Sequence, residues 1–558
     1  MNKNKMVEIM IEKLLNLIKQ QIQGIIKNEF NLELKEEEIF FDVPKDKEHG
    51  DYSTNIAMKL ARPLRMNPIM IAKKICECLD LESNHLNKVL VAGSGFINLY
   101  LKKDFVNQVI FKINEEKENY GNSNLGNGKK VNIEYVSANP TGFLHVGHCR
   151  GAAYGDSLSR IYKKAGYDVN REYYINDGGN QIENLVKSIY ARYNELFGLP
   201  FSLDDDCYHG KEIIEIAKMI KDEVGDKYVI NNDYQYCHDY FRQFGVNYLL
   251  NNLKKDLKDF NVEFDTWFSE KSLYDNGDVE RAIKRLKDNG YTYEQDGAVW
   301  LKTTEYGDEK DRVLVKSDKT LTYLTPDIAY HMNKLGRGYE ELIDVLGADH
   351  YGYISRLKAA IKYSGGNPDA LNVDILQMVR VLQDGEEVKM SKRSGKAITM
   401  RDLLDEVGSD SLRFMFIHKA LSTQMDLDLS LAVKQSNDNP VFYAQYAYAR
   451  IRSLFNKFEN YQEVKEFTKL DFSKLQDIMT LLVQYPSVVE EAASKRIPHK
   501  LTQFALSLAS AFHSYYNDEA IITDDVLLTN EKLTVLNAVA IVLKDALNLV
   551  GVNTKEKM

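Results

Sequence analysis

Two histidines and a distant group of lysines are the side chains in this sequence best suited to phosphate chemistry. The histidines lie in the segment Ala138, Asn139, Pro140, Thr141, Gly142, Phe143, Leu144, His145, Val146, Gly147 and His148. Residues three apart share one face of a helix, and a helix N-terminus favours a phosphate. Gly147 lets a base or a phosphate approach the backbone closely. The histidines alone would also suit zinc or a helix cap, but no third His, Cys or carboxylate lies nearby at ligand spacing.

The lysines lie in a short basic segment, Lys389, Met390, Ser391 and Lys392, followed by Arg393, Ser394 and Gly395. A cationic loop of this kind can close over a triphosphate and neutralise the charge that builds up as pyrophosphate leaves. In isolation, such a segment is more often a solvated surface turn. A His-x-Gly-His after a strand, with a Lys-Met-Ser-Lys some 240 residues later, strongly resembles the paired signatures of class I aminoacyl-tRNA synthetases.

These two segments need a scaffold that brings them together. Residues 6–30 show helical periodicity and 89–101 form two expected strands around a glycine-rich turn, so a small α/β domain is predicted over 1–115. From 120 to 400, strands predicted at 130–137, 169–174, 298–301, 313–315, 344–346 and 374–381 alternate with helices. This alternation indicates a Rossmann-type parallel sheet with an insertion. Residues 401–440 are expected to form a connecting helical segment and 441–558 an all-α bundle, so the fold class is multidomain α/β.

Composition and charge restrict the class of protein. The chain has 558 residues, 44% hydrophobic and 28% charged, which fits a globular protein of two to four domains. A net charge of −10 argues against coating nucleic acid, but not against reading one RNA through local patches. No apolar run approaches the ~20 residues of a membrane helix, and no signal-peptide core is present. Five cysteines without a framework fit a reducing cytosol, so we expect a soluble cytoplasmic protein with no membrane contact.

Further motifs make the resemblance specific to one family of class I synthetases. They are Asn132–Gly142, Asn176–Gln181, Tyr323–His331, Gly347–Tyr353 and Gln435–Pro440, with His49–Asn55 and Gly93–Asn98 near the N-terminus. Together they are similar to the bacterial type of arginyl-tRNA synthetase over essentially the whole chain. Two positions depart from the family pattern: Val146 replaces isoleucine, and Lys319 stands where the family generally has glycine. If the turn at Lys319 needs a positive φ, that residue is mildly strained.

The resemblance implies a two-step reaction. Arginine and ATP, with Mg²⁺ carried by the nucleotide, would form arginyl-adenylate and pyrophosphate. The arginyl group would then pass to the terminal ribose of tRNA(Arg), whose anticodon the 441–558 bundle would bind. By the same resemblance, residues 138–148 and 389–392 bind ATP, and the catalytic residues are His145, His148, Lys389 and Lys392. No metal site built from protein alone is expected, and the enzyme is expected to be a monomer.

The resemblance also implies an arginine pocket. A guanidinium is a planar fork of five donors, best met by carboxylates and amide oxygens in fixed positions. The implied pocket residues are Glu134, Asn139, Tyr323 and Asp327, with Ser137 and His148 near the α-amino and carboxylate end. Taken singly, Glu134 could be an ordinary strand carboxylate, and Asp327 could be a helix cap just after Pro326.

Three other functions remain open at this stage. Another class I synthetase, for example for cysteine or glutamate, would share both signatures. An RNA-binding protein could keep the fold without catalysis, although the intact His145, His148, Lys389 and Lys392 argue against it. A small-molecule nucleotidyltransferase would share the sheet but would have no use for the helical C-terminal segment.

Overall fold

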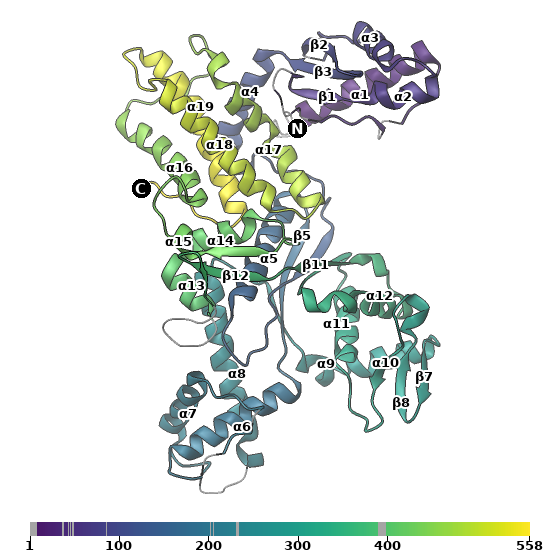
Figure 1. Cartoon of the computed structure of the whole chain (residues 1–558), viewed down its shortest axis with the longest axis vertical. Coiled ribbons are helices and arrows are strands. Elements are labelled where there is room, and N and C mark those ends of the chain that lie inside the picture. The colour runs from purple at the N-terminus through teal and green to yellow at the C-terminus, as the bar shows by residue number, and fades with distance from the viewer. Residues whose placement is uncertain are drawn as a thin grey trace.

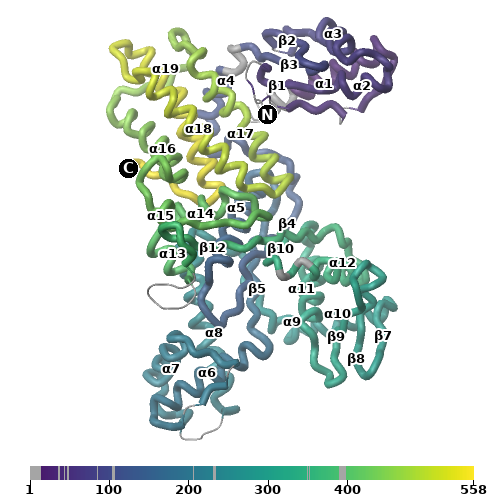
Figure 2. Tube along the Cα trace, in the orientation of Figure 1, coloured from purple at the N-terminus to yellow at the C-terminus, as the bar shows by residue number. Residues whose placement is uncertain are grey.

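The molecule is elongated, with a central α/β body between a helical end and two smaller lobes (Figure 1). The computed structural model describes residues 8–35, 38–42, 44, 46, 49–84, 86–200, 202–204, 206–229, 234–388 and 398–558. Figure 2 traces the chain from the N-terminal unit through the central body and lobes and back to a helical bundle. The last part of the chain therefore lies beside the first.

The N-terminal unit is a three-stranded antiparallel sheet, in the order β1-β3-β2, packed with three helices. The helix expected over 6–30 is present from Glu8, and it buries Leu14, Ile18 and Ile22 in the core of this unit. A further helix, α4 (Lys103–Glu116), leads from the unit to the bundle. The elements of the unit are α1 (Glu8–Phe30), β1 (Tyr52–Thr54), α2 (Ile56–Leu64), α3 (Pro68–Cys78), β2 (Leu86–Ala92) and β3 (Phe96–Leu101).

The central body contains the expected parallel sheet, with strand order β11-β10-β4-β5-β6. Its strands are β4 (Lys130–Glu134), β5 (Asp168–Ile175), β6 (Thr266–Ser269), β10 (Glu341–Gly347) and β11 (Leu371–Leu376). The first crossover helix is α5 (Val146–Lys164). Because β5 lies on one side of β4 and β10 on the other, the strand order reverses at β4. Ligands of open parallel sheets bind beyond the carboxyl ends of the strands at such a point.

Some predicted strands lie outside this sheet. Those expected at 298–301 and 313–315 form, but they belong to a separate antiparallel sheet of β7 (Thr292–Gln295), β8 (Ala298–Leu301) and β9 (Arg312–Val315). Asp296 and Gly297 both have positive φ, the conformation of a two-residue hairpin turn, which fixes β7 and β8 as antiparallel. The strand expected at 374–381 is divided between β11 and β12 (Val379–Gln383). A third small sheet pairs β12 with β13 (Glu386–Glu387) and β14 (Met425–Asp428).

The two lobes are insertions in the central body (Figure 1). One is helical, with its own apolar core, and consists of α6 (Gly179–Glu195), α7 (Lys211–Val224) and α8 (Tyr234–Asp259). The other combines the β7–β9 sheet with α9 (Lys271–Asp275), α10 (Asp278–Asp288), α11 (Leu324–Gly336) and α12 (Ile354–Tyr363). Lys319, in the turn before α11, has a φ of 71°, so this position does require the left-handed conformation that favours glycine.

The predicted C-terminal bundle is all-α. It consists of α16 (Pro440–Lys457), α17 (Gln476–Ser494), α18 (His499–Asp518) and α19 (Val526–Leu549), joined to the body by α13 (Met400–Val407), α14 (Ser409–His418) and α15 (Leu429–Ala432). Among the described residues, α19 is the one helix long and apolar enough to cross a membrane, and 72% of its most apolar window is buried. One apolar core runs from Ile133 on β4 through Leu158 on α5 to Leu536 on α19.

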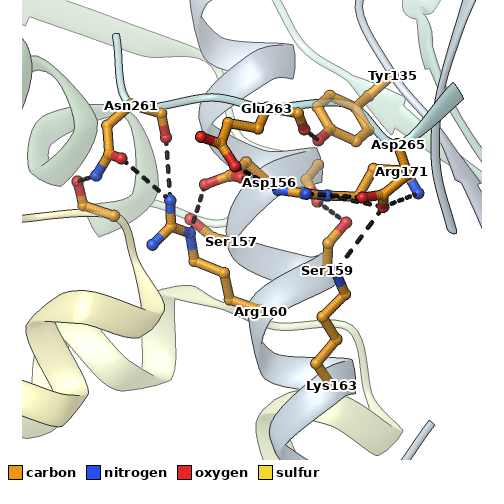
Figure 3. Close-up of polar contacts among 12 residues, drawn as sticks. Tyr135, Asp156, Ser157, Ser159, Arg160, Lys163, Arg171, Asn261, Glu263 and Asp265 are labelled. Carbon is orange, nitrogen blue, oxygen red and sulfur yellow. Dashed lines mark hydrogen bonds and ion pairs between the residues drawn. The ribbon is translucent and has the colours of Figure 1, made fainter. Parts of the chain in front are cut away.

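Hydrogen bonds from arginine side chains join α5 to the segment that follows α8, as Figure 3 shows, and to α14. Nε of Arg160 donates to Asp156 Oδ2 at 2.7 Å, and Nη2 of Arg160 donates to the carbonyl of Asn261 at 3.1 Å. The fully buried Arg413 on α14 also donates to Asp156 Oδ2, at 2.7 Å, and its Nε donates to the carbonyl of Val550 at 2.9 Å. The helix that begins at the histidines is thus tied to the end of the bundle.

Candidate active site

A cavity of about 940 Å³ lies at the carboxyl ends of β4 and β10, between the first turn of α5 and α11. Nine of the predicted site residues line it: Glu134, Ser137, Ala138, Asn139, His145, Gly147, His148, Tyr323 and Asp327. Six of the predicted nucleotide-binding residues do not: Pro140, Thr141, Gly142, Phe143, Leu144 and Val146. The predicted residues Lys389, Met390, Ser391 and Lys392 lie outside the described residues.

The two histidines cap the helix that they begin. His145 is the N-cap of α5, and its Nδ1 accepts from the backbone N–H of Gly147 at 3.2 Å. Nδ1 of His148 accepts from the backbone N–H of His145 at 3.2 Å, and the rings stack with centroids 3.8 Å apart. A Cβ at Gly147 would lie 3.2 Å from Cε1 of His145, so glycine makes room for the ring. The helix-cap alternative is therefore observed, together with the placement of both rings at the cavity.

Burial sets the charge of both histidine rings, and the capping hydrogen bonds set which ring nitrogen carries the proton. Burial lowers the pKa of His145; burial and the neighbouring His145 lower the pKa of His148 to about 3, so both rings are neutral at pH 7. Because each Nδ1 accepts from the backbone, the remaining proton is on Nε2. The pair therefore presents two neutral N–H donors, which suit phosphate oxygens without adding charge.

The residues that follow the basic segment are hydrogen-bonded to the histidine segment. Thr399 forms an antiparallel bridge with His145, and the backbone N–H of Met400 donates to the carbonyl of Leu144 at 2.7 Å. The side chain of Thr399 then caps α13 through Asp402. His145 and Thr399, 254 residues apart in sequence, are thereby joined at the edge of the cavity.

Asp327 presents a carboxylate to the cavity from the first turn of α11. Its Oδ2 accepts from the hydroxyl of Tyr353 at 2.6 Å, and among the described residues no lysine or arginine forms an ion pair with it. Burial raises the pKa of Asp327 to about 6. The N-cap of α11 is Tyr323, and no side chain caps this helix, so the helix-cap interpretation of Asp327 is wrong. Tyr323 itself is 77% exposed at the mouth of the cavity.

Glu270 is a second cavity carboxylate, and it is not among the predicted site residues. It follows β6 directly, is buried, and accepts a 3.5 Å hydrogen bond from the hydroxyl of Tyr274. Burial, and then the charge of Asp327, raise its pKa. In the described chain no cationic side chain pairs with Glu270. The available signal was its position at the end of a strand, but β6 has only four residues and follows a long helical insertion.

Glu134, by contrast, already has a cationic partner. The fully buried Lys334 on α11 donates from Nζ to Oε2 of Glu134, and also to Oδ1 of Asp344 at 2.9 Å. Oε1 of Glu134 accepts from the hydroxyl of Ser137 at 2.9 Å. Nδ2 of Asn139 donates to Oε1 of Gln181 at 2.6 Å. The acidic groups of the cavity without a basic partner in the described chain are therefore Asp327 and Glu270.

A parallel sheet with His-x-Gly-His at its first crossover helix, followed by a helical bundle, defines a class I aminoacyl-tRNA synthetase. Three family models match: "Arginyl tRNA synthetase N terminal domain" over 12–101, "tRNA synthetases class I (R), catalytic domain" over 109–433 and "DALR anticodon binding domain" over 444–558. The chain belongs to the arginyl-tRNA synthetase family.

Individual relatives agree with the family models. The chain is 47% identical to the arginine–tRNA ligase of Anoxybacillus flavithermus, over 98% of this chain and 100% of the relative. It is also 47% identical to that of Bacillus subtilis, over 98% and 99%. The fold matches the solved Thermus thermophilus arginyl-tRNA synthetase with a TM-score of 0.73 and 20% identity, over 97% of this chain and 99% of that one. The protein is an arginine–tRNA ligase, and its substrates are arginine, ATP and tRNA.

Proposed function

We propose that arginine binds with its guanidinium at Asp327 and Glu270, below Tyr323 at the mouth of the cavity. The observation that supports this orientation is the presence of two buried or half-buried carboxylates with no basic partner in the described chain. The permanent charge of a guanidinium would offset the free-energy cost of burying these two carboxylates. The carboxylates in turn would replace the hydrogen bonds that the guanidinium loses when it leaves water. The α-amino and carboxylate end of arginine then reaches Ser137, Asn139 and His148, with Glu134 behind them.

The same orientation directs the arginine carboxylate toward the nucleotide. ATP binds along residues 138–148 and 389–392, and Mg²⁺ enters with it as part of the substrate. The carboxylate attacks the α-phosphate, the Nε2–H groups of His145 and His148 donate to phosphate oxygens, and Lys389 and Lys392 stabilise the charge on the departing pyrophosphate. Positioning and electrostatics supply most of the rate in such transfers.

We also propose a role for each remaining part of the chain, supported by the family models that match it. Residues 1–115 contact tRNA, 120–400 form the catalytic domain, 401–440 connect, and 441–558 bind the anticodon of tRNA(Arg). The enzyme acts as a monomer in the cytoplasm, without membrane contact.

Competition by two arginine analogues tests the orientation. Agmatine keeps the guanidinium but lacks the carboxylate, whereas citrulline keeps the carboxylate but is neutral at the other end. We expect agmatine to inhibit tRNA charging competitively against arginine, and citrulline to inhibit far more weakly. Citrulline binding as tightly as agmatine would show that no desolvated carboxylate pair receives the guanidinium.

A further inference from the structure

The chain makes a strained turn as it leaves β4 and enters the cavity. Val136 and Ser137 have φ values of 69° and 41°, and the N–H of Ser137 donates to the carbonyl of Tyr135 at 3.0 Å. A hydrogen bond between residues two apart, about a central residue with this φ, is the rare and strained form of the γ-turn. Among the described non-glycine residues with positive φ, Val136 is the only β-branched one. Such a residue is a genuine outlier there, and strain of this kind persists only where the surroundings enforce it.

The side chain of Ser137 holds the turn in this conformation. Its hydroxyl donates to Oε1 of Glu134 at 2.9 Å and accepts from the backbone N–H of Tyr174 at 3.0 Å. On the far side of the turn, the hydroxyl of Tyr173 donates to the carbonyl of Ala138 at 2.7 Å. The carboxylate of Glu134 therefore reaches from the end of β4 across the turn to Ser137.

Glu134 is held in turn by a balanced group of buried charges. Nζ of Lys334 bonds to Glu134 and Asp344 and lies 4.3 Å from the centre of the Tyr330 ring. Nε2 of His331 lies 2.8 Å from Oδ2 of Asp344, and its Nδ1 lies 2.7 Å from the carbonyl of Asp327. Both ring nitrogens of His331 face acceptors, which favours the cation. Two carboxylates thus face two cations in this buried group.

We propose that Lys334 is a positioning residue that never touches substrate: through Glu134 and Ser137 it holds the strained turn in the shape that receives the α-amino and carboxylate end of arginine. This inference rests on the proposed placement of that end of arginine at Ser137. Without the ammonium, the Glu134 carboxylate loses its partner and its fixed position, and the turn relaxes toward ordinary β geometry. Ser137 is then displaced from the position in which it contacts arginine, and arginine binds more weakly.

A second ion pair, at the C-cap of the same helix, provides a control. Nη1 and Nη2 of Arg337, three residues beyond Lys334, donate to the two oxygens of the fully buried Glu172 at 2.6 and 2.7 Å. Neither residue lines the cavity. Arg337→Met therefore removes an ion pair to another buried carboxylate, from a side chain that is itself 28% exposed, and leaves Lys334, Glu134 and Ser137 unchanged.

The first test is the steady-state kinetics of tRNA charging by Lys334→Met and Arg337→Met, with thermal melting of both. We expect Lys334→Met to raise KM for arginine about tenfold or more while KM for ATP stays within about twofold. Arg337→Met should lower the melting temperature but leave KM for arginine within about twofold. An unchanged KM for arginine in folded Lys334→Met, or an equal rise in Arg337→Met, would overturn the proposal.

The second test is rescue by glycine. Glycine adopts a positive φ without steric cost, whereas alanine does not. Adding Val136→Gly to Lys334→Met should recover about threefold or more of the lost arginine affinity, and adding Val136→Ala should recover clearly less, because alanine removes the β-branch but keeps the Cβ. Equal recovery by the two would contradict the strain argument. If Lys334→Met does not fold, Lys334→Gln, which keeps a polar side chain but no charge at this position, takes its place, and the same glycine rescue is required of it.

The two proposals fail separately. If analogue competition shows that the guanidinium does not lie at Asp327 and Glu270, the orientation of arginine is wrong whatever Lys334→Met does. If the competition gives the expected result but Val136→Gly does not restore arginine affinity in Lys334→Met, the orientation of arginine stands and only the positioning role of Lys334 is wrong.

Discussion

The hydroxyl of Tyr353 donates a 2.6 Å hydrogen bond to Oδ2 of Asp327, and in the described chain this carboxylate has no basic partner. One neutral donor does not compensate a carboxylate that is removed from water. A cationic group on the substrate should therefore stabilise the Asp327 carboxylate strongly when it binds.

Asp327→Asn should raise KM for arginine strongly and leave KM for ATP nearly unchanged. The amide keeps the shape but replaces a charged acceptor, and half of it is a donor facing other donors. The expected loss is about 2–4 kcal/mol, the scale of a buried charge-assisted pair. Charging kinetics measure both constants, and discrimination against citrulline should shrink in the same variant. Normal arginine affinity in this variant would show that Asp327 does not bind the guanidinium.

The same substitution should stabilise the free protein at neutral pH. The pKa of Asp327 is raised from 3.8 to about 6. The folded state therefore binds the proton more tightly than the unfolded state, and stability falls as pH rises from about 4 to about 6. A shift of about two units corresponds to at most ~3 kcal/mol. Urea unfolding without substrates should find Asp327→Asn more stable at pH 7.5, with the gain shrinking toward pH 4. A gain that is independent of pH would have another cause.

Glu270→Gln should also raise KM for arginine, by about 1–3 kcal/mol. Since both carboxylates are proposed to bind one guanidinium, the double variant with Asp327→Asn should lose less than the sum of the two single losses. Glu280→Gln, an exposed carboxylate on α10, is the control and should leave KM for arginine unchanged. Full additivity would mean that Glu270 and Asp327 act on different groups.

Lys392→Ala should lower kcat far more than it raises KM for ATP. The charge of Lys392 is proposed to act on the departing pyrophosphate rather than on bound ATP, and one preorganised electrostatic group is worth about 2–4 kcal/mol. Charging rates at saturating ATP give kcat, and their dependence on ATP gives KM. An effect confined to KM would assign Lys392 to ground-state binding.

Gly551→Ala should destabilise the protein through Arg413. Gly551 has a φ of 71°, and an added Cβ would lie 2.1 Å from Cζ of the fully buried Arg413. Gly307→Ala is a suitable control, because its φ is 90°, in the left-handed region, but nothing lies within 4 Å of an added Cβ. We expect a loss of about 1 kcal/mol at Gly307, from backbone strain alone, and about 2–4 kcal/mol at Gly551. Equal losses in denaturant unfolding would show that the Arg413 contact is easily rearranged.

The parts of this fold that depend on local pattern could be predicted from sequence. The helix expected over 6–30 is described from Glu8 to Phe30, and the strand expected at the start of the central sheet forms as β4 and is followed by the helix that begins at the histidines. What could not be predicted depends on partners distant in sequence. Lys334 reaches Glu134 across 200 residues, and no local pattern indicates that pairing. Glu270 was missed because a four-residue strand has too little alternation to be recognised.

The contact of Arg413 with the last turn of the bundle bears on how the protein is made. Arg413 is buried at the base of the catalytic body, and its Nε donates to the carbonyl of Val550, 137 residues further along the chain. The backbone N–H of Asn553 likewise donates to Asp410 at 2.9 Å. A chain that folds from its N-terminus during synthesis cannot complete these contacts until Val550 and Asn553 have been made and have left the ribosome. The catalytic body of this enzyme of protein synthesis therefore gains its last buried contacts only after the whole helical bundle has itself been translated.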